Sequence, residues 1–250
     1  MLTALHDLAS PLFGTAYAWG IAIILLTVVV RVLLLPLAIK QINSMRAMQG
    51  IQPELKKIQK KYKADRSLMR TDPEKYKAQR QKQQEAMMAL YKEHNVNPAS
   101  SCLPLVAQMP IFVALFSVLR SPDVVPQLQE VGFFLIPSLA AQPSQGLAAA
   151  GVGAYILMVL MAVSTFVSQK QMMGRTPTAG DQAQQQQKIM LYVMPLMLTV
   201  FSWNFPIGVL LYWVTTNLWT MGQQWFMFRN VEQNVAVAGA GTRPPSKGRG

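Results

Sequence analysis

Cysteine and histidine are nearly absent from this sequence of 250 residues, which contains one cysteine, Cys102, and two histidines, His6 and His94. A single cysteine cannot form a disulfide within the chain, and so few histidine and cysteine side chains do not suffice for a zinc site. We therefore expect neither a metal site nor a bound cofactor.

Acidic residues are also scarce, with 11 Asp and Glu against 23 Lys and Arg, which gives a net charge of +12. None of the acidic residues falls within the long apolar runs, so a carboxylate proton relay or cation site inside a membrane is not supported. Those runs also lack a Ser/His pair, and the sequence has neither paired aspartates nor a nucleotide-binding glycine loop. These absences exclude the usual membrane proteases and pumps, and we expect no enzymatic activity.

Long apolar runs, by contrast, are abundant. Hydrophobic residues make up 51% of the chain and the mean hydropathy is +0.22, values typical of a membrane protein. Five stretches reach or approach the roughly 17 to 25 residues that a membrane-spanning helix needs. They are residues 19–37, 103–119, 146–167, 189–203 and 207–228. The fourth contains Pro195, and a turn at residues 204–206 joins it to the fifth as a tight helical hairpin. We predict an all-α, polytopic membrane protein with five transmembrane helices.

The distribution of basic residues predicts the orientation of these helices. Residues 38–101 carry 14 of the 23 Lys and Arg, and residues 168–188 and 229–250 carry most of the others. The positive-inside rule assigns these three regions to the cytoplasm and residues 1–18 and 120–145 to the outside. The N-terminus is therefore expected outside and the C-terminus in the cytoplasm.

The terminal segments and the second cytoplasmic loop are expected to differ in order. Residues 1–18 lack Lys and Arg, and their apolar pattern is interrupted by His6, Asp7 and Pro11. This pattern predicts an interfacial amphipathic lead-in without a cleaved leader. The loop of residues 168–188, with its glycines, prolines and glutamine run, is expected to be flexible. The tail of residues 229–250, rich in Gly, Pro and basic residues, is expected to be disordered.

Residues 38–101 show helical periodicity. Apolar residues recur at spacings of three and four from Met48 to Tyr62, and Asp72, Pro73 and Glu74 begin a second helix with an N-cap, a first-turn proline and an acidic residue. We predict a cytoplasmic two-helix hairpin that turns between residues 63 and 71. Its narrow apolar faces fit either a solvated charged spacer or a docking surface for an anionic partner, such as lipid head groups, ribosomal RNA or acidic targeting factors.

Arg31 is the one charged residue within the five apolar runs. A guanidinium near the centre of a spanning helix costs roughly 2.5 to 3.5 kcal/mol, and it cannot escape this cost by losing its proton. Arg31 lies about nine residues, or ~13 Å, from the basic end near Lys40, which is farther than a side chain reaches comfortably. Snorkelling to the surface is one interpretation, but an internal polar site that hydrates or binds the guanidinium is favoured.

Polar residues in two other runs lie at depths that match Arg31. Gln108 is about six residues, or ~9 Å, inside the second run. The fifth run contributes four further candidates, Tyr212, Trp213, Thr216 and Asn217. Each of these side chains could simply bond to its own helix or to a neighbouring one. Together with an uncompensated arginine, they predict a hydrated groove suited to transient binding of an acidic or polar peptide.

Three motifs in the expected order resemble the YidC insertase family. The first is Arg31 followed by Leu-Pro-Leu at residues 35–37 and a basic hairpin. The second is Cys-Leu-Pro-Leu-Val-Ala-Gln-Met-Pro-Ile-Phe at residues 102–112, and the third is Asn-Phe-Pro-Ile-Gly-Val-Leu-Leu-Tyr-Trp at residues 204–213, followed by Asn217. The resemblance covers residues 13–229. With no large extracytoplasmic domain and no cleaved leader expected, the chain is most similar to the short, Gram-positive-type bacterial form.

This resemblance implies a membrane protein insertase and chaperone of the bacterial plasma membrane. Its groove, with Arg31, Gln108 and Asn217, would admit the polar segment of a nascent membrane protein while the hydrophobic segment passes into the lipid bilayer. The implied partners are nascent membrane proteins, the ribosome, the Sec translocon and, at the hairpin, targeting factors. The alternative is a small anion transporter or channel that uses Arg31 as its binding charge. An odd number of spans, the lack of an internal repeat and the large basic hairpin argue against this alternative.

Overall fold

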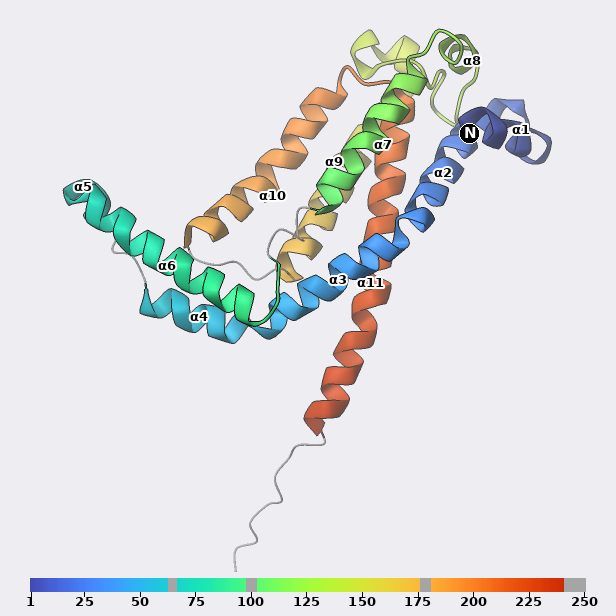
Figure 1. The fold of residues 1–250 in the computed structure, drawn as a ribbon. Helices are drawn as coiled ribbons and strands as arrows, with labels where there is room; N and C mark the ends of the chain where they lie inside the picture. The colour runs from blue at the N-terminus through green and yellow to red at the C-terminus, as the bar shows by residue number, and fades with distance from the viewer. Residues whose placement is uncertain (63–66, 98–102, 176–180, 241–250) are drawn as a thin grey trace, which may run out of the picture.

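The computed structural model describes residues 1–62, 67–97, 103–175 and 181–240, and these residues are almost entirely helical (Figure 1). The helices are α1 (Leu2–Phe13), α2 (Thr15–Leu33), α3 (Leu35–Gly50), α4 (Gln52–Lys61), α5 (Leu68–Thr71), α6 (Pro73–Glu93), α7 (Leu103–Leu119), α8 (Val125–Gln129), η2 (Pro143–Gln145), α9 (Leu147–Arg175), α10 (Asp181–Ser202) and α11 (Ile207–Ala240). The described ranges contain no β-strand, so the predicted all-α class is confirmed.

Two of these helices are long and apolar enough to cross a membrane by length and composition. They are α2 and the Leu147–Gly174 part of α9, with mean hydropathies of 2.2 and 2.1. The apolar Val106–Leu119 part of α7 is shorter. The helices α2, α7 and α9 all pack against α11, and α10 packs against α9. The bundle is thus built around the α9/α11 pair.

A bend separates α2 from α3, so the first apolar run is not one straight helix. The helix α2 ends at Leu33 and α3 begins at Leu35, with Pro36 in its first turn. Proline has no N–H to bond back to the preceding turn, and its ring clashes with a continuing helix, so the chain changes direction here. The bend leaves Arg31 in the last turn of α2, next to the place where α3 turns away.

One end of the bundle is closed by a hydrophobic cluster into which the segment between α8 and η2 is folded (Figure 1). Backbone bonds fix this segment against the helices. The N–H of Gly153 donates to the Leu135 carbonyl at 3.1 Å, and the N–H of Gly208 donates to the Leu139 carbonyl at 3.0 Å. Leu139 is fully buried, and the ring of Phe133 lies directly against Gly20 of α2. We call residues 131–141 the sealing loop.

The opposite end of the molecule carries α4 and α6, which pack against each other (Figure 1). Their shared apolar cluster includes Leu55 and Leu90. The Asp72 side chain accepts a hydrogen bond from the N–H of Lys75 at 3.1 Å and Pro73 begins α6, which confirms the predicted helix start. Residues 63–66, within the predicted turn, lie outside the described residues.

Helices extend into two segments that were expected to be irregular. Within residues 168–188, α9 continues to Arg175 and α10 already begins at Asp181, while residues 176–180 lie outside the described residues. Within the expected disordered tail, α11 continues to Ala240, and residues 241–250 lie outside the described residues. The structure therefore has helix where irregular chain was expected, at residues 168–175, 181–188 and 229–240. The reason is compositional, because glutamine is a good helix former and residues 229–238 contain neither Gly nor Pro.

Candidate functional site

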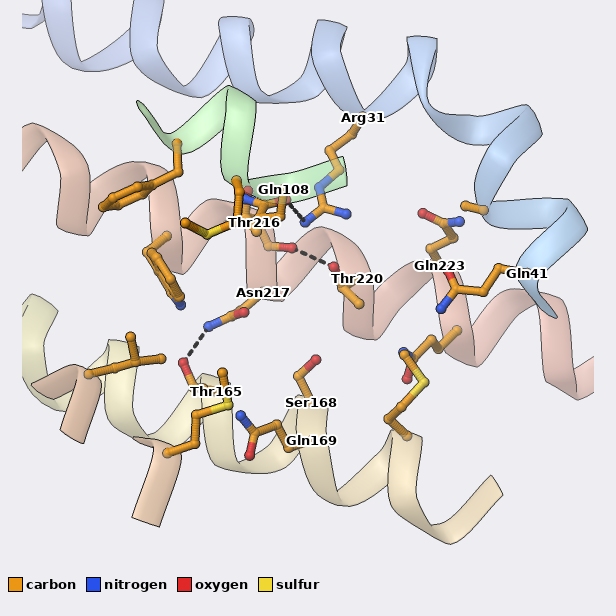
Figure 2. A pocket seen from close by; sticks show the side chains of 18 of the residues that line it. Arg31, Gln41, Gln108, Thr165, Ser168, Gln169, Thr216, Asn217, Thr220 and Gln223 are labelled. Carbon is orange, nitrogen blue, oxygen red and sulfur yellow. Dashed lines mark hydrogen bonds between the residues drawn. The ribbon is translucent and has the colours of Figure 1, made fainter. Parts of the chain in front are cut away.

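A cavity of about 440 Å³ lies between six helices, α2, α3, α7, α9, α10 and α11 (Figure 2). Its walls combine apolar and polar side chains. The apolar lining includes Met109, Phe112, Met194, Leu198 and Phe201, and the polar lining includes Arg31, Gln41, Gln108, Thr165, Ser168, Gln169, Thr216, Asn217, Thr220, Gln223 and Gln224. Its size and its mixture of apolar walls with hydrogen-bonding groups on several sides are typical of a ligand-binding site.

Arg31 belongs to a hydrogen-bonded chain that crosses three helices. Its guanidinium donates to Oε1 of Gln108 on α7 at 3.5 Å, and Nε2 of Gln108 donates to the hydroxyl of Tyr212 on α11 at 2.5 Å. Tyr212 is 2% exposed and does not line the cavity. The tyrosine therefore lies behind the wall and orients Gln108, which in turn contacts Arg31.

The guanidinium of Arg31 has no carboxylate partner among the described residues. The ion pairs found in that part of the chain are His6 with Asp7, Lys77 with Glu74 and His94 with Glu54, all remote from the cavity. The single bond from Arg31 to the neutral Gln108 is long for a hydrogen bond and leaves most of its N–H donors available. A partly buried cation without a counter-ion attracts an acidic group from outside the molecule.

Asn217 has a different position from Arg31 on the cavity wall. Its Nδ2 atom donates to the hydroxyl oxygens of Ser164, at 3.0 Å, and Thr165, at 2.8 Å, both on α9. Figure 2 shows this contact on the side of the cavity opposite Arg31. Asn217 therefore joins α11 to α9, the pair at the centre of the bundle.

The remaining two predicted residues, Trp213 and Thr216, also line the cavity. The Trp213 ring packs edge-on against Phe112 of α7, with ring centroids 5.6 Å apart. Five of the six predicted residues thus share one cavity, and Tyr212 supports it from behind. Sequence reasoning did not select Gln41 of α3 or Ser164, Thr165 and Gln169 of α9. Polar residues recur at positions 164, 165, 168 and 169, on one helical face at the end of the third run and just beyond it, and this was the signal available for the α9 residues.

Replacing Asn217 with leucine is expected to lower the free energy of unfolding by about 1 to 2 kcal/mol, because two buried hydrogen bonds between α11 and α9 are lost. For a protein of this size, the melting temperature in detergent should fall by roughly 2 to 8 °C. Thr215→Val is the matched control, because the Thr215 hydroxyl bonds only to the Leu211 carbonyl of its own helix at 2.8 Å. Equal melting temperatures for the two variants, measured by circular dichroism, would contradict the proposed role of Asn217 as a link between helices.

The fold and the site together define a helical membrane protein in which apolar helices surround a cationic, hydrogen-bonding cavity. The family model described as 60Kd inner membrane protein matches residues 11–73 and 69–234. These matches include every residue that lines the cavity, and the chain belongs to this family.

Several curated relatives share more than a third of their aligned residues with this chain. Membrane protein insertase YidC of Streptomyces avermitilis is 38% identical over 254 residues, which cover 92% of this chain and 56% of the relative. The protein of the same name from Oceanobacillus iheyensis is 39% identical over 208 residues, covering 82% of this chain and 72% of the relative. Membrane protein insertase YidC 2 of Bacillus anthracis is 35% identical over 243 residues, covering 97% and 83%. The chain thus spans between about half and most of the length of these relatives.

A solved structure supports the same relationship. The structure described as an active YidC insertase crystal structure with the first transmembrane domain resolved matches this chain with a TM-score of 0.62 and 28% sequence identity. The match covers 90% of this chain and 44% of the solved chain.

Proposed function

We propose that this protein is a membrane protein insertase and chaperone. It admits the polar segment of a nascent membrane protein into the cavity beside Arg31 and releases the hydrophobic segment into the bilayer. The observation that carries the proposal is a partly buried cation on the cavity wall without a carboxylate partner among the described residues. Curated relatives with the name membrane protein insertase support the same function. No covalent step is required.

Five helices, α2, α7, α9, α10 and α11, span the membrane in this proposal. Large apolar side chains on their outward surfaces support it, because a protein in water rarely exposes so many of them together. Examples of side chains that are more than half exposed are Val106, Val113, Val159, Leu196, Val200 and Phe226. The positive-inside distribution then puts α4 and α6 in the cytoplasm of a bacterial cell and the sealing loop outside.

The closed end of the bundle favours an insertase over the alternative, an anion transporter or channel. The sealing loop and the hydrophobic cluster around Trp19, Ile23 and Leu119 fill the outer end with fully or nearly fully buried apolar side chains. Hydrated anions do not cross such a layer without a large desolvation cost. The cavity residues instead extend from Arg31 to Gln41 and Phe228, toward the basic end. A polar segment therefore enters from the cytoplasm and reaches only part of the membrane.

The side of the cavity between α7 and α10 is the proposed exit for hydrophobic segments. The principal packing partner of α7 is α11 and that of α10 is α9, so these two helices border the cavity without extensive contact with each other. Their cavity-lining residues include Met109 on α7 and Met194 on α10. Methionine side chains adapt to differently shaped apolar partners, which suits a surface that meets many sequences.

The basic helices α4 and α6 receive the substrate in this proposal, and the basic C-terminal tail assists contact with the ribosome. The lysines of α4, such as Lys56 and Lys60, are exposed, while Leu55 of the same helix is buried against α6. Such a surface is suited to anionic partners. Targeting factors at these helices, and cooperation with the Sec translocon, are further proposed partners.

The test is insertion by the purified protein in lipid vesicles. Radiolabelled single-span nascent chains are expected to acquire a protease-protected segment in vesicles with the protein and to remain digestible in vesicles without it. Uptake of labelled anionic solutes by the same vesicles should equal that of empty vesicles. Solute uptake without insertion would replace this proposal with the transporter.

A further inference from the structure

Three further glutamines line the cavity and take no part in the hydrogen-bonded chain of Arg31, Gln108 and Tyr212. They are Gln41 on α3, Gln169 on α9 and Gln224 on α11, which we call the glutamine layer. Figure 2 shows Gln41 and Gln169 reaching from helices on different sides of the cavity. Gln41 is 8% exposed and Gln224 is 5% exposed. The layer therefore consists largely of buried amides from three separate helices.

Each member of the glutamine layer has a buried atom with unused hydrogen-bonding capacity. Nε2 of Gln41, Oε1 of Gln169 and Oε1 of Gln224 make no hydrogen bond to any other residue in the part of the chain that the structure describes. Nε2 of Gln224 has only the weak sulfur acceptor of Met172, at 3.8 Å. Leaving a polar group unsatisfied in a buried site costs about 1 to 3 kcal/mol. The layer thus presents one unused donor and two unused acceptors, and its own side chains carry no charge.

We propose that the glutamine layer binds the main chain of the polar segment as it passes through the cavity, a role that rests on the proposed insertase function. An irregular peptide brings one N–H donor and one C=O acceptor per residue, and these groups need partners once they leave water. A glutamine side chain offers both kinds of partner. Because the main chain is the same in every sequence, this site binds segments regardless of their charge, whereas Arg31 favours acidic ones.

The mixture of donors and acceptors favours a peptide over the phosphate of a lipid. A phosphate offers only acceptor oxygens at neutral pH, so it can bond to Nε2 of Gln41 but not to the carbonyl oxygens of Gln169 and Gln224. It would also gain little from a neutral site, because phosphate recognition relies on cationic partners. A peptide backbone satisfies all three unused atoms.

The first experiment compares two substrates of equal length whose translocated segments are either acidic or neutral. The variant Gln41→Met/Gln224→Met keeps side-chain length and volume but removes both amides. We expect it to slow vesicle insertion of both substrates to a similar degree, by roughly fivefold to tenfold, because about one hydrogen bond is lost at each position. The control Gln127→Met/Gln129→Met changes two exposed glutamines of α8 and should leave both rates unchanged.

The second experiment tests main-chain recognition directly. A neutral segment of glycines is replaced by one of N-methylglycines, which lack the N–H donor. The wild-type protein should insert the N-methylated segment more slowly than the glycine segment. The double methionine variant keeps only the Gln169 acceptor, so it should show a smaller difference between the two segments. Melting temperatures of all proteins are compared, so that a folding defect is separated from a binding defect.

Three results would overturn the proposal. The first is insertion of both substrates by the double variant at wild-type rates, and the second is slower insertion of the acidic substrate alone. The third is less co-purified phospholipid in the double variant with unchanged insertion, which would assign the layer to a lipid head group. If the wild-type protein inserted neither substrate, the proposed insertase function would itself fail, which is a different result from any of these three.

Discussion

An Arg31→Ala variant is expected to insert substrates with acidic translocated segments at least about tenfold more slowly than the wild-type protein, because a charge-assisted contact is worth roughly 1.5 to 3 kcal/mol. Arg31→Lys should stay largely active, since an ammonium group also attracts a carboxylate. The bond from Arg31 to Gln108 is long, so little hydrogen-bonding energy within the protein is lost on substitution. The protease-protected fraction of a radiolabelled nascent chain in reconstituted vesicles measures the effect.

Two controls isolate the role of charge at Arg31. A substrate with a neutral translocated segment should be inserted by Arg31→Ala at close to the wild-type rate. Arg120→Ala removes a basic residue outside the cavity, one that lies over the Phe116 ring at 5.0 Å, and should leave both substrates unaffected. If Arg31→Ala inserted every acidic substrate at the wild-type rate, recognition by the cavity charge would be wrong, although membership of the family would stand.

The residues of the candidate site that could be predicted from the sequence are those with a high energetic cost in an apolar setting. Arg31 is conspicuous because no acidic residue accompanies it in its run, and Gln108 and Asn217 are conspicuous because amides are uncommon in apolar helices. Their approximate depths follow from the constant rise of a helix. Which helix each side chain faces does not follow from depth. The structure assigns Gln108 to Arg31 and Asn217 to α9, and the sequence alone favours neither pairing.

Other features depend on packing that has no local signal in the sequence. Gln41 lies four residues beyond the first apolar run, and only the bend at Pro36 brings it to the cavity wall. The sealing loop has no helical or strand periodicity in its sequence. Its position depends on backbone hydrogen bonds to the starts of α9 and α11, which no local pattern predicts. The all-α class was predictable because apolar runs of this length have few alternatives in a membrane. The ends of α9, α10 and α11 were not, because the glycines and prolines near them indicated loops, although the glutamines and alanines there are good helix formers.

Gly151→Ala is expected to be among the most destabilising single substitutions in the protein, with a loss of roughly 3 kcal/mol or more. Gly151 has φ 72° and ψ 167°, a conformation that is open essentially to glycine alone. A Cβ atom there would also lie 2.5 Å from the carbonyl oxygen of Leu135 and against the Pro137 ring. Backbone strain and a backbone clash therefore act together. The melting temperature in detergent should fall by about 6 °C or more.

Two other glycines separate the causes of this effect. Gly174 lies near the end of the same helix with open space around it, so Gly174→Ala should be neutral or stabilising by up to about 1 kcal/mol. Gly20 meets the ring of Phe133, a side chain that can shift, so Gly20→Ala should destabilise less than Gly151→Ala. If the melting temperature of Gly151→Ala equalled that of Gly174→Ala, the sealing loop would not be held by its backbone contact at Leu135. The other outcome is a melting temperature of Gly151→Ala well below that of Gly20→Ala, together with loss of insertion of both acidic and neutral substrates. Closure of the outer end would then be required for the cavity to function, whatever the cavity binds.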